Sequence, residues 1–528
     1  MGWLDSAVTM ARQLAAGIGL GCGQGWLVLQ RKAAGVRRMF ERRGVLWCVS
    51  GCMALAGLFG AGPVRAQTAP AAQTAPAAPA TRGNPTPGQT GTGTPPQSPS
   101  PGAPTGLFER SQVLGGMGGL RPGLGQYGVS LGLTETSEVL GNLAGGRRRE
   151  VVYEGLTEVS LGVDLGRAVG LTGGVVNISA LQVHGRGLSA NAIDTLNLAS
   201  GIEADRSIRL FEAWYQQTVL GGRADVKIGQ QSADQEFMVS QYAGAFVNAG
   251  FGWATLPGVD LPSGGPAYPL GVPGVRLRVQ PGAGMTVLLG VFDGSPAGLG
   301  RGDPQRRDPS GTNFDLGSGV LVIGEVQYAI NQGEGARGLP ATYKLGAWYS
   351  SDASADPFFA NAPVPAAGAF AGPPGARRPD YSVYAVVDQL VYRPKGAKNG
   401  GAGLFLRAMG APGDRNVVDV SATGGVTYKG VFGRENDTVG LGAGWARVGG
   451  RARGGDAALA ALPGGPYPVR SSERLVELTY QAQVAPWWSV QPDVQYVFNA
   501  GGGVPNPDRP GRRVGDAAVL ALRTTVTF

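Results

Sequence analysis

Apolar and polar residues alternate with a period of two along much of the chain after residue 107. Residues 151–165 show this most clearly, because every second position from Val151 to Leu165 is uncharged, while three of the intervening residues are acids, Glu154, Glu158 and Asp164. Successive side chains of a β-strand point to opposite faces. The pattern therefore predicts strands with one apolar face and one polar face.

The alternation recurs in residues 320–330, 342–350, 418–429, 476–484 and 490–498, and again up to the last residue, Phe528. A soluble antiparallel sheet also alternates. Three features favour a membrane barrel instead. The segments have the length of tilted spanning strands, tyrosine or tryptophan stands near strand ends, and the chain ends on a strand with a terminal aromatic, which is typical of outer-membrane barrels.

The number of strands follows from the length of the alternating region. A sheet spans hydrocarbon only if it is closed, because every backbone N–H and C=O needs a partner there. Residues 107–528 number 422 (528 − 107 + 1), and roughly 25 residues per strand and connection give about 16 strands. The prediction is an all-β fold, a transmembrane antiparallel β-barrel over 107–528 that encloses an aqueous lumen.

The N-terminus has the three parts of a secretory signal. A basic stretch ends at Arg43, an uncharged run covers residues 44–64, and a small-x-small pattern ends at Ala66. We therefore expect a signal peptide over 39–66 that is cleaved near Ala66, with Met39 as the true start and 1–38 as an over-extended start.

Two alternatives to a cleaved signal remain open. The uncharged run is long enough to be a membrane anchor, and residues 49–52 resemble a lipoprotein cleavage site.

Residues 67–106 follow as a tether rich in Pro, Ala and Gly, in which QTAPAA occurs at 67–72 and again at 73–78. Such a composition cannot bury a core, so we expect this stretch to be a disordered linker.

Charge and composition narrow the function further. Residues 1–66 contain eight basic and two acidic residues, so the remaining 37 basic and 35 acidic residues leave a net charge of only +2 after residue 66. The pI of 9.5 is thus no evidence for nucleic-acid binding. The chain has one histidine and no cysteine after Cys52, so we expect no metal site, no disulfide, no cofactor and no catalytic site.

Several long stretches resemble the carbohydrate-selective porin family of the OprB type. The matching stretches are LGLTETSEVLGNLAGG at 131–146, VVYEGL at 151–156, HGRGLSAN at 184–191, GQQSADQEFMVSQYAGAFVNAGFGWATLPGVDLPSGGPAYPL at 229–270, YAVVDQLVYRP at 384–394, GAPGDRNVVD at 410–419 and VAPWWSVQPDVQYVFNAGGG at 484–503. They follow one another along nearly the whole barrel region.

The resemblance implies a 16-stranded barrel in the outer membrane of a Gram-negative bacterium. It implies passive passage of monosaccharides, glucose above all, into the periplasm, through a pore that a long inward-folded loop narrows. Residues 230–273 suit this constriction loop, since structureless segments of this length are uncommon unless functional. The expected partners are the sugar, outer-membrane lipid and the barrel-insertion machinery, with a homo-oligomer possible.

Counting the strand phase beside this loop selects candidate pore-lining residues. An apolar face made of Phe211, Ala213 and Tyr215 is expected to point outward. The residues expected to line the pore and bind sugar are Glu212, Trp214, Gln216, Lys227, Gln231, Asp234, Arg276 and Arg278. An aromatic ring can stack on the apolar face of a sugar, while polar groups exchange hydrogen bonds with its hydroxyls.

Each candidate also has a structural interpretation, as part of a charge network that only shapes the pore. His184 is expected to be structural, and the G-x-S-x-G pattern at 128–132 lies on a strand and not on a strand–turn–helix elbow. The alternatives to a sugar-selective channel are a general porin without sugar selectivity, an export or secretion barrel, and an outer-membrane lipase or protease.

Overall fold

The computed structural model describes residues 107–298, 302–317, 319–333, 336–354, 357–358, 378–396, 400–463, 466–509 and 511–528. The predicted over-extended start (1–38), signal peptide (39–66) and tether (67–106) lie outside the described residues.

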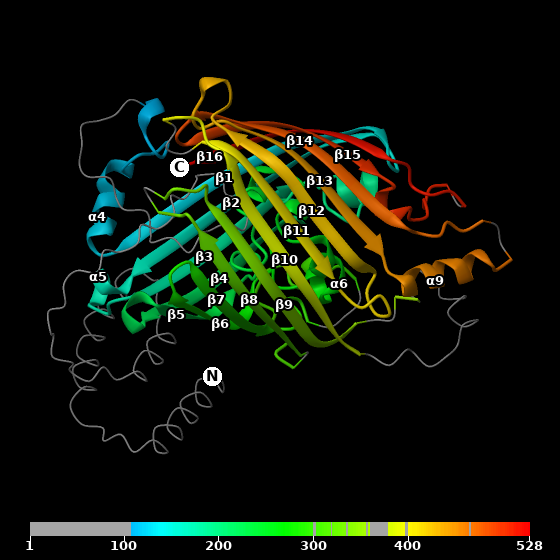
Figure 1. Cartoon of the computed structure of the whole chain (residues 1–528), viewed down its shortest axis with the longest axis horizontal. Helices are drawn as coiled ribbons and strands as arrows, with labels where there is room; N and C mark the ends of the chain where they lie inside the picture. The colour runs from blue at the N-terminus through cyan, green and yellow to red at the C-terminus, as the bar shows by residue number, and fades with distance from the viewer. Residues whose placement is uncertain are drawn as a thin grey trace, which may run out of the picture. The chain divides into compact units, whose positions relative to one another are not determined.

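The described residues form sixteen antiparallel strands that close into a barrel (Figure 1). The strands are β1 Val129–Gly145, β2 Glu150–Asp164, β3 Gly174–Gly185, β4 Ser207–Val219, β5 Ala224–Gln231, β6 Val272–Gly282, β7 Met285–Asp293, β8 Val320–Ile330, β9 Ala341–Ser354, β10 Arg378–Tyr392, β11 Gly401–Gly410, β12 Val418–Lys429, β13 Thr438–Val448, β14 Ser472–Ala485, β15 Trp488–Phe498 and β16 Ala517–Thr527. Each strand pairs with its neighbours in the chain, and β1 pairs with β16. The predicted fold class is confirmed.

The two ends of the barrel differ in the length of their connections. At one end, which we call the turn end, residues 220–223, 283–284 and 486–487 join neighbouring strands. The opposite, loop end carries the long segments 186–206 and 232–271. At the turn end the last residue is held in place, because the N–H of Phe528 donates to the carbonyl oxygen of Leu133 at 2.9 Å.

The short helices of the described residues lie before β1 or in the connections between strands. They are α4 Leu120–Gln126, α5 Leu165–Val169, α6 Thr255–Asp260, α7 Pro304–Arg307 and α9 Gly450–Ala460, with single turns at Leu107–Glu109, Met117–Gly119, Ser189–Ile193, Leu220–Gly222, Ala243–Ala245, Ala249–Phe251, Pro262–Gly264, Val431–Gly433 and Ala500–Gly502. None of the helices in these ranges has the length and apolar character needed to cross a membrane.

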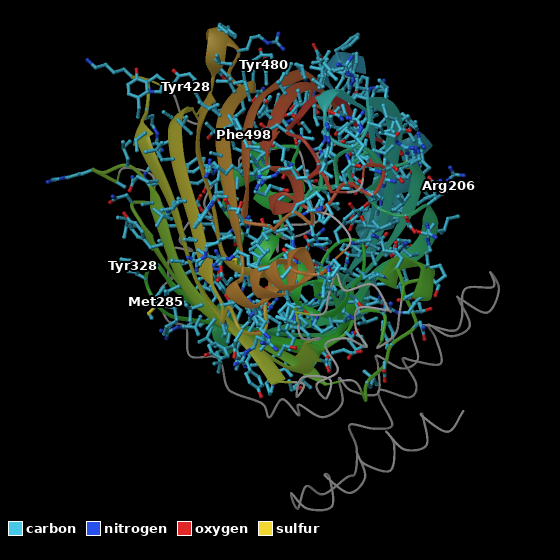
Figure 2. The ribbon with its side chains drawn as sticks, turned by 90° about the vertical axis from the view of Figure 1, so that its right-hand side faces the viewer. Arg206, Met285, Tyr328, Tyr428, Tyr480 and Phe498 are labelled. Carbon is cyan, nitrogen blue, oxygen red and sulfur yellow. The ribbon has the colours of Figure 1, made fainter. Side chains whose placement is uncertain are left out.

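The alternation predicted from the sequence sorts side chains between the two faces of the barrel wall. On β14, Glu477 and Thr479 are buried inside the barrel, while Val476 and Leu478, which alternate with them, are exposed on the outside. Tyr328 and Met285 likewise point away from the barrel at its outer edge (Figure 2). An apolar exterior is stable only against lipid, so this sorting agrees with a membrane barrel.

The packed core lies between the inner wall and the loops. The ring centroids of Phe246 and Phe251, both in the segment 232–271, are 4.4 Å apart. Each ring also lies within 6 Å of Phe405 on the inner side of β11, at 5.6 and 5.9 Å. The loop is therefore anchored by hydrophobic packing as well as by the polar contacts described next.

Candidate functional site

Residues 232–271, between β5 and β6, fold into the lumen and form the constriction loop. In Figure 2 the ring of strands encloses segments in green, the colour of this part of the chain. The wall holds the loop by its backbone on opposite sides: the N–H of Met238 donates to Glu325 on β8 at 2.8 Å, and the N–H of Val247 donates to Glu477 on β14 at 2.6 Å. The inward-folded loop predicted from the family resemblance is thus present.

Basic residues of the wall bind the carbonyl groups of the same loop. Arg407 on β11 is buried and donates to the carbonyl oxygens of Met238 at 3.1 Å, Gly252 at 2.6 Å and Gly250 at 2.5 Å. Lys344 on β9 donates to the carbonyl oxygen of Val239 at 2.7 Å. Charged groups that bind the backbone in this way fix the loop without depending on its side chains.

A second loop, residues 186–206 between β3 and β4, also folds inward, and the sequence analysis missed it. Glu473 on β14 accepts hydrogen bonds from the N–H groups of Leu196 at 2.8 Å and Asn197 at 3.2 Å. Gln495 on β15 donates to the carbonyl oxygen of Ala199 at 2.8 Å. The available signal was a segment of 21 residues without alternation, residues 186–206, which contains most of the family-like stretch 184–191.

Six of the predicted residues share one stretch of inner wall on β4, β5 and β6. Trp214 is half-buried, its indole N–H donates to Glu212 at 3.0 Å, and the Lys227 ammonium lies 4.7 Å from the centre of its ring. Arg276 donates to Gln216 at 3.1 Å. The side chains therefore form one continuous polar surface that runs from β4 to β6.

Two acids that the sequence analysis did not select complete this surface. Asp225 on β5 pairs with Arg276 and with Arg278, the latter at 2.6 Å. Glu236 of the constriction loop pairs with Lys227 and with Arg276, the latter at 2.6 Å. We call Glu212, Trp214, Gln216, Asp225, Lys227, Glu236, Arg276 and Arg278 the charged ladder.

Exposure separates the members of the charged ladder. Arg276 is 0% exposed and surrounded by its partners, whereas the Arg278 side chain remains 28% exposed. Glu236 lies in the sequence DQEF of the predicted constriction loop. An acid at this place was the signal from which Glu236 could have been predicted. Arg278 and the ring of Trp214 are the members best placed to meet a solute.

The other two predicted residues position the loop. Gln231 is buried and donates to the carbonyl oxygen of Gly274 at 2.9 Å. Asp234 accepts the N–H of Tyr268 at 2.9 Å, and its burial raises the pKa of its carboxyl group to about 7. Whether any of the eight predicted residues contacts a sugar stays a prediction.

One predicted orientation is wrong. Phe211 was expected to face outward with Ala213 and Tyr215, but it is buried and packs against Tyr268 of the constriction loop, with ring centroids 6.2 Å apart. The register explains the difference, because Ser179 pairs with Glu212 and Ala180 pairs with Leu210, which leaves Phe211 in a β-bulge. A bulge inserts one residue and shifts the phase, so Phe211 and Glu212 both point inward.

The family model described as "Carbohydrate-selective porin, OprB family" matches residues 148–528. The chain belongs to this family. This OprB-family porin is 25% identical to Porin B of Pseudomonas aeruginosa over 413 residues, which cover 74% of the chain and 87% of Porin B. The family resemblance predicted from the sequence is confirmed, and it makes the protein a porin of the Gram-negative outer membrane.

Solved structures support the fold of this porin. OprB of Pseudomonas putida at high pH is 23% identical, with a TM-score of 0.68 over 80% of this chain and 100% of that chain. The low-pH structure of the same protein is 18% identical, with a TM-score of 0.50 over 80% of this chain and 99% of that chain. At these identities the likeness concerns the fold alone.

A chamber of about 290 Å³ lies between the loops of this porin, and no member of the charged ladder lines it. Its walls come from the segment 186–206, the constriction loop and α7, and they include Asn197, Asp234 and Trp253. The indole N–H of Trp253 donates to the carbonyl oxygen of Gly264 at 2.9 Å, which fixes the ring. The chamber thus lies between the two inward-folded loops.

Proposed function

We propose that this porin is a passive diffusion channel for monosaccharides such as glucose, which pass through it into the periplasm. The observation that carries the proposal is the charge balance of the ladder. It contains three basic residues (Lys227, Arg276 and Arg278) and three acidic residues (Glu212, Asp225 and Glu236), so the formal charges balance, and ion pairs join the three basic residues to Asp225 and Glu236. A balanced surface rich in donors and acceptors suits an uncharged, hydroxylated solute better than an ion.

The ring of Trp214 adds the apolar part of such a site. A sugar that crosses a narrow pore sheds water, and hydroxyl groups without partners then oppose its passage. Stacking on Trp214 and hydrogen bonds to Arg278 offset this loss, yet both residues hold the sugar only on one side. Weak binding of this kind allows release as well as entry. The proposal involves no covalent step.

Current through single channels in a planar bilayer tests the proposal. Glucose is expected to reduce the ion current at concentrations at which gluconate, an anionic sugar acid of similar size, reduces it less. Liposome swelling should rank monosaccharides above disaccharides. A general porin without sugar selectivity would instead pass solutes in order of size alone, with no glucose-dependent reduction of the current.

A further inference from the structure

Exposed arginines gather on one side of the loop end. They come from three connections between strands that are neighbours in the barrel: 146–149 between β1 and β2, 186–206 between β3 and β4, and 499–516 between β15 and β16. The members of this arginine belt are Arg147, Arg148, Arg149, Arg186, Arg206, Arg509, Arg512 and Arg513. Arg147 is half-buried and the other seven are exposed. Figure 2 shows Arg206 pointing away from the barrel.

Ion pairs hold arginines of different connections in one patch. Glu150, the first residue of β2, pairs with Arg148 at 3.0 Å and also with Arg186 from the next connection. Arg147 donates two hydrogen bonds to Asp508 of the connection 499–516, at 2.5 and 3.0 Å. This hydrogen bonding by Arg147, together with the nearby charge of Arg148, lowers the pKa of Asp508. The belt is therefore continuous from β15 to β3.

The acids of the same region do not neutralise the belt. They are Asp194, Glu203, Asp205, Asp508 and Asp516, with Glu150 at the start of β2. Glu203 is buried and accepts the N–H and the hydroxyl group of Ser189, and Asp205 pairs with Arg306 of α7 at 2.9 Å. Eight arginines and the four other acids leave a formal net charge of +4. The connection 294–319 between β7 and β8, in contrast, contains three basic and three acidic residues.

The outer wall beside the belt is apolar. Val151 directly follows Glu150 and is 64% exposed, and Ile208 on β4 comes two residues after Arg206 and is 76% exposed. The long loops of an outer-membrane barrel lie on the external face, and an apolar band meets the acyl chains below them. The belt therefore lies at the level where the outer leaflet changes from acyl chains to headgroups.

We propose that the arginine belt binds the phosphate groups of an outer-leaflet lipid whose acyl chains lie against the adjacent apolar wall. Guanidinium groups bind phosphate oxygens through paired, charge-assisted hydrogen bonds, and basic clusters beside a membrane bind anionic headgroups. A free anion would contact the arginines alone, whereas a phosphorylated lipid also contacts Val151 and Ile208. The proposal is independent of the sugar channel, because no member of the belt belongs to the charged ladder or lines the chamber.

Binding of fluorescent lipid A with two phosphate groups to the whole porin in detergent micelles tests the proposal. Binding is expected to weaken as salt is added, and inorganic phosphate at the concentration of the lipid should not displace the lipid. Arg149→Gln combined with Arg512→Gln removes two exposed members of the belt and should weaken binding roughly 10- to 30-fold. Arg453→Gln combined with Arg474→Gln, on α9 and β14, is the matched control, because both arginines are exposed at the same end of the barrel. This control should bind the lipid as the unchanged chain does.

Three results would overturn the proposal. The first is equal binding of lipid A without phosphate groups, the second is equal weakening in the two double variants, and the third is complete displacement by inorganic phosphate, which would indicate a site for free anions. A shift of the unboiled barrel on a gel shows that each variant has folded. Glucose-dependent current is recorded on the same variants and should be the same in all of them, so failure of lipid binding is distinguishable from failure of the proposed sugar channel.

Discussion

The ammonium group of Lys227 lies 4.7 Å from the centre of the Trp214 ring, while the indole N–H of the same ring donates to Glu212. A cation over one ring and a carboxylate at its edge fix the orientation of Trp214 on the inner wall. A ring fixed in this way can stack on a sugar without a further loss of side-chain freedom.

Trp214→Ala should therefore weaken the reduction of current by glucose. If stacking is worth about 1 kcal/mol, the glucose concentration that halves the current rises by roughly fivefold. Titration of single channels with glucose measures this value. Trp445→Ala, on the outward side of β13, is the matched control and should leave it unchanged. An unchanged value for Trp214→Ala, together with a less stable barrel, would show that the ring only supports the wall.

The two arginines of the ladder should respond differently to substitution. Arg276→Ala removes the buried cation that Asp225 and Glu236 share and leaves each acid with one remaining cation, so the folded barrel should unfold at a clearly lower temperature. Arg278 is partly exposed, so Arg278→Ala should change ion selectivity and glucose binding with little loss of stability. Heat-induced unfolding on gels and reversal potentials in a salt gradient separate the two effects. Equal stability of both variants would contradict the assignment of Arg276 as the buried, structural arginine and of Arg278 as the one that meets the solute.

Arg407→Met should loosen the constriction loop. The substitution removes the donors to the carbonyl oxygens of Met238, Gly250 and Gly252, and each lost partner costs about 1–3 kcal/mol if the carbonyl stays buried. Conductance should rise, and the preference for monosaccharides over disaccharides in liposome swelling should fall. Arg474→Met, on the exposed outer side of β14, serves as the control. Unchanged conductance would mean that packing of the loop phenylalanines is sufficient.

Asp234 should make stability depend on pH. Its pKa is about 7 in the folded protein because its carboxyl is buried and Glu212 lies nearby, against about 3.9 in an unfolded chain. The folded state thus holds the proton more tightly, and the unfolding free energy falls as pH rises from about 4 to about 7. Asp234→Asn should flatten this part of the profile of unfolding temperature against pH, whereas Glu435→Gln on an exposed turn should not. A parallel shift of the whole profile would exclude Asp234 as its source.

Deletion of Phe528 should lower the amount of protein in the outer membrane. The N–H of Phe528 donates to Leu133, and Arg121 binds its carbonyl oxygen, so the terminal residue closes the seam between β1 and β16. The insertion machinery is expected to read this last strand. Membrane levels measured by immunoblotting should fall, while glucose-dependent current per inserted channel stays the same. Normal protein levels in the outer membrane would show that the insertion machinery reads a different part of the chain.

The sequence alone was sufficient for the fold and for most of the wall. Side chains of a strand alternate strictly, so the pattern of Val476 and Leu478 against Glu477 and Thr479 determined which face meets lipid. The same counting placed Trp214, Lys227 and Arg276 on one inner surface. Long stretches such as 229–270 identified the family and the constriction loop.

Only the tertiary structure decided the contacts that depend on register and on distant parts of the chain. A β-bulge at Phe211 reverses the orientation of its side chain, and no local sequence pattern predicts which strand contains the bulge. The partners of the loops, such as Glu473 for Asn197, are set by the closure of the barrel. Glu135 on β1 and His184 on β3 are distant in the sequence, and the antiparallel pairing of both strands with β2 brings them together on the outer wall. Sequence periodicity determines the face on which a residue lies, but not its neighbours on adjacent strands.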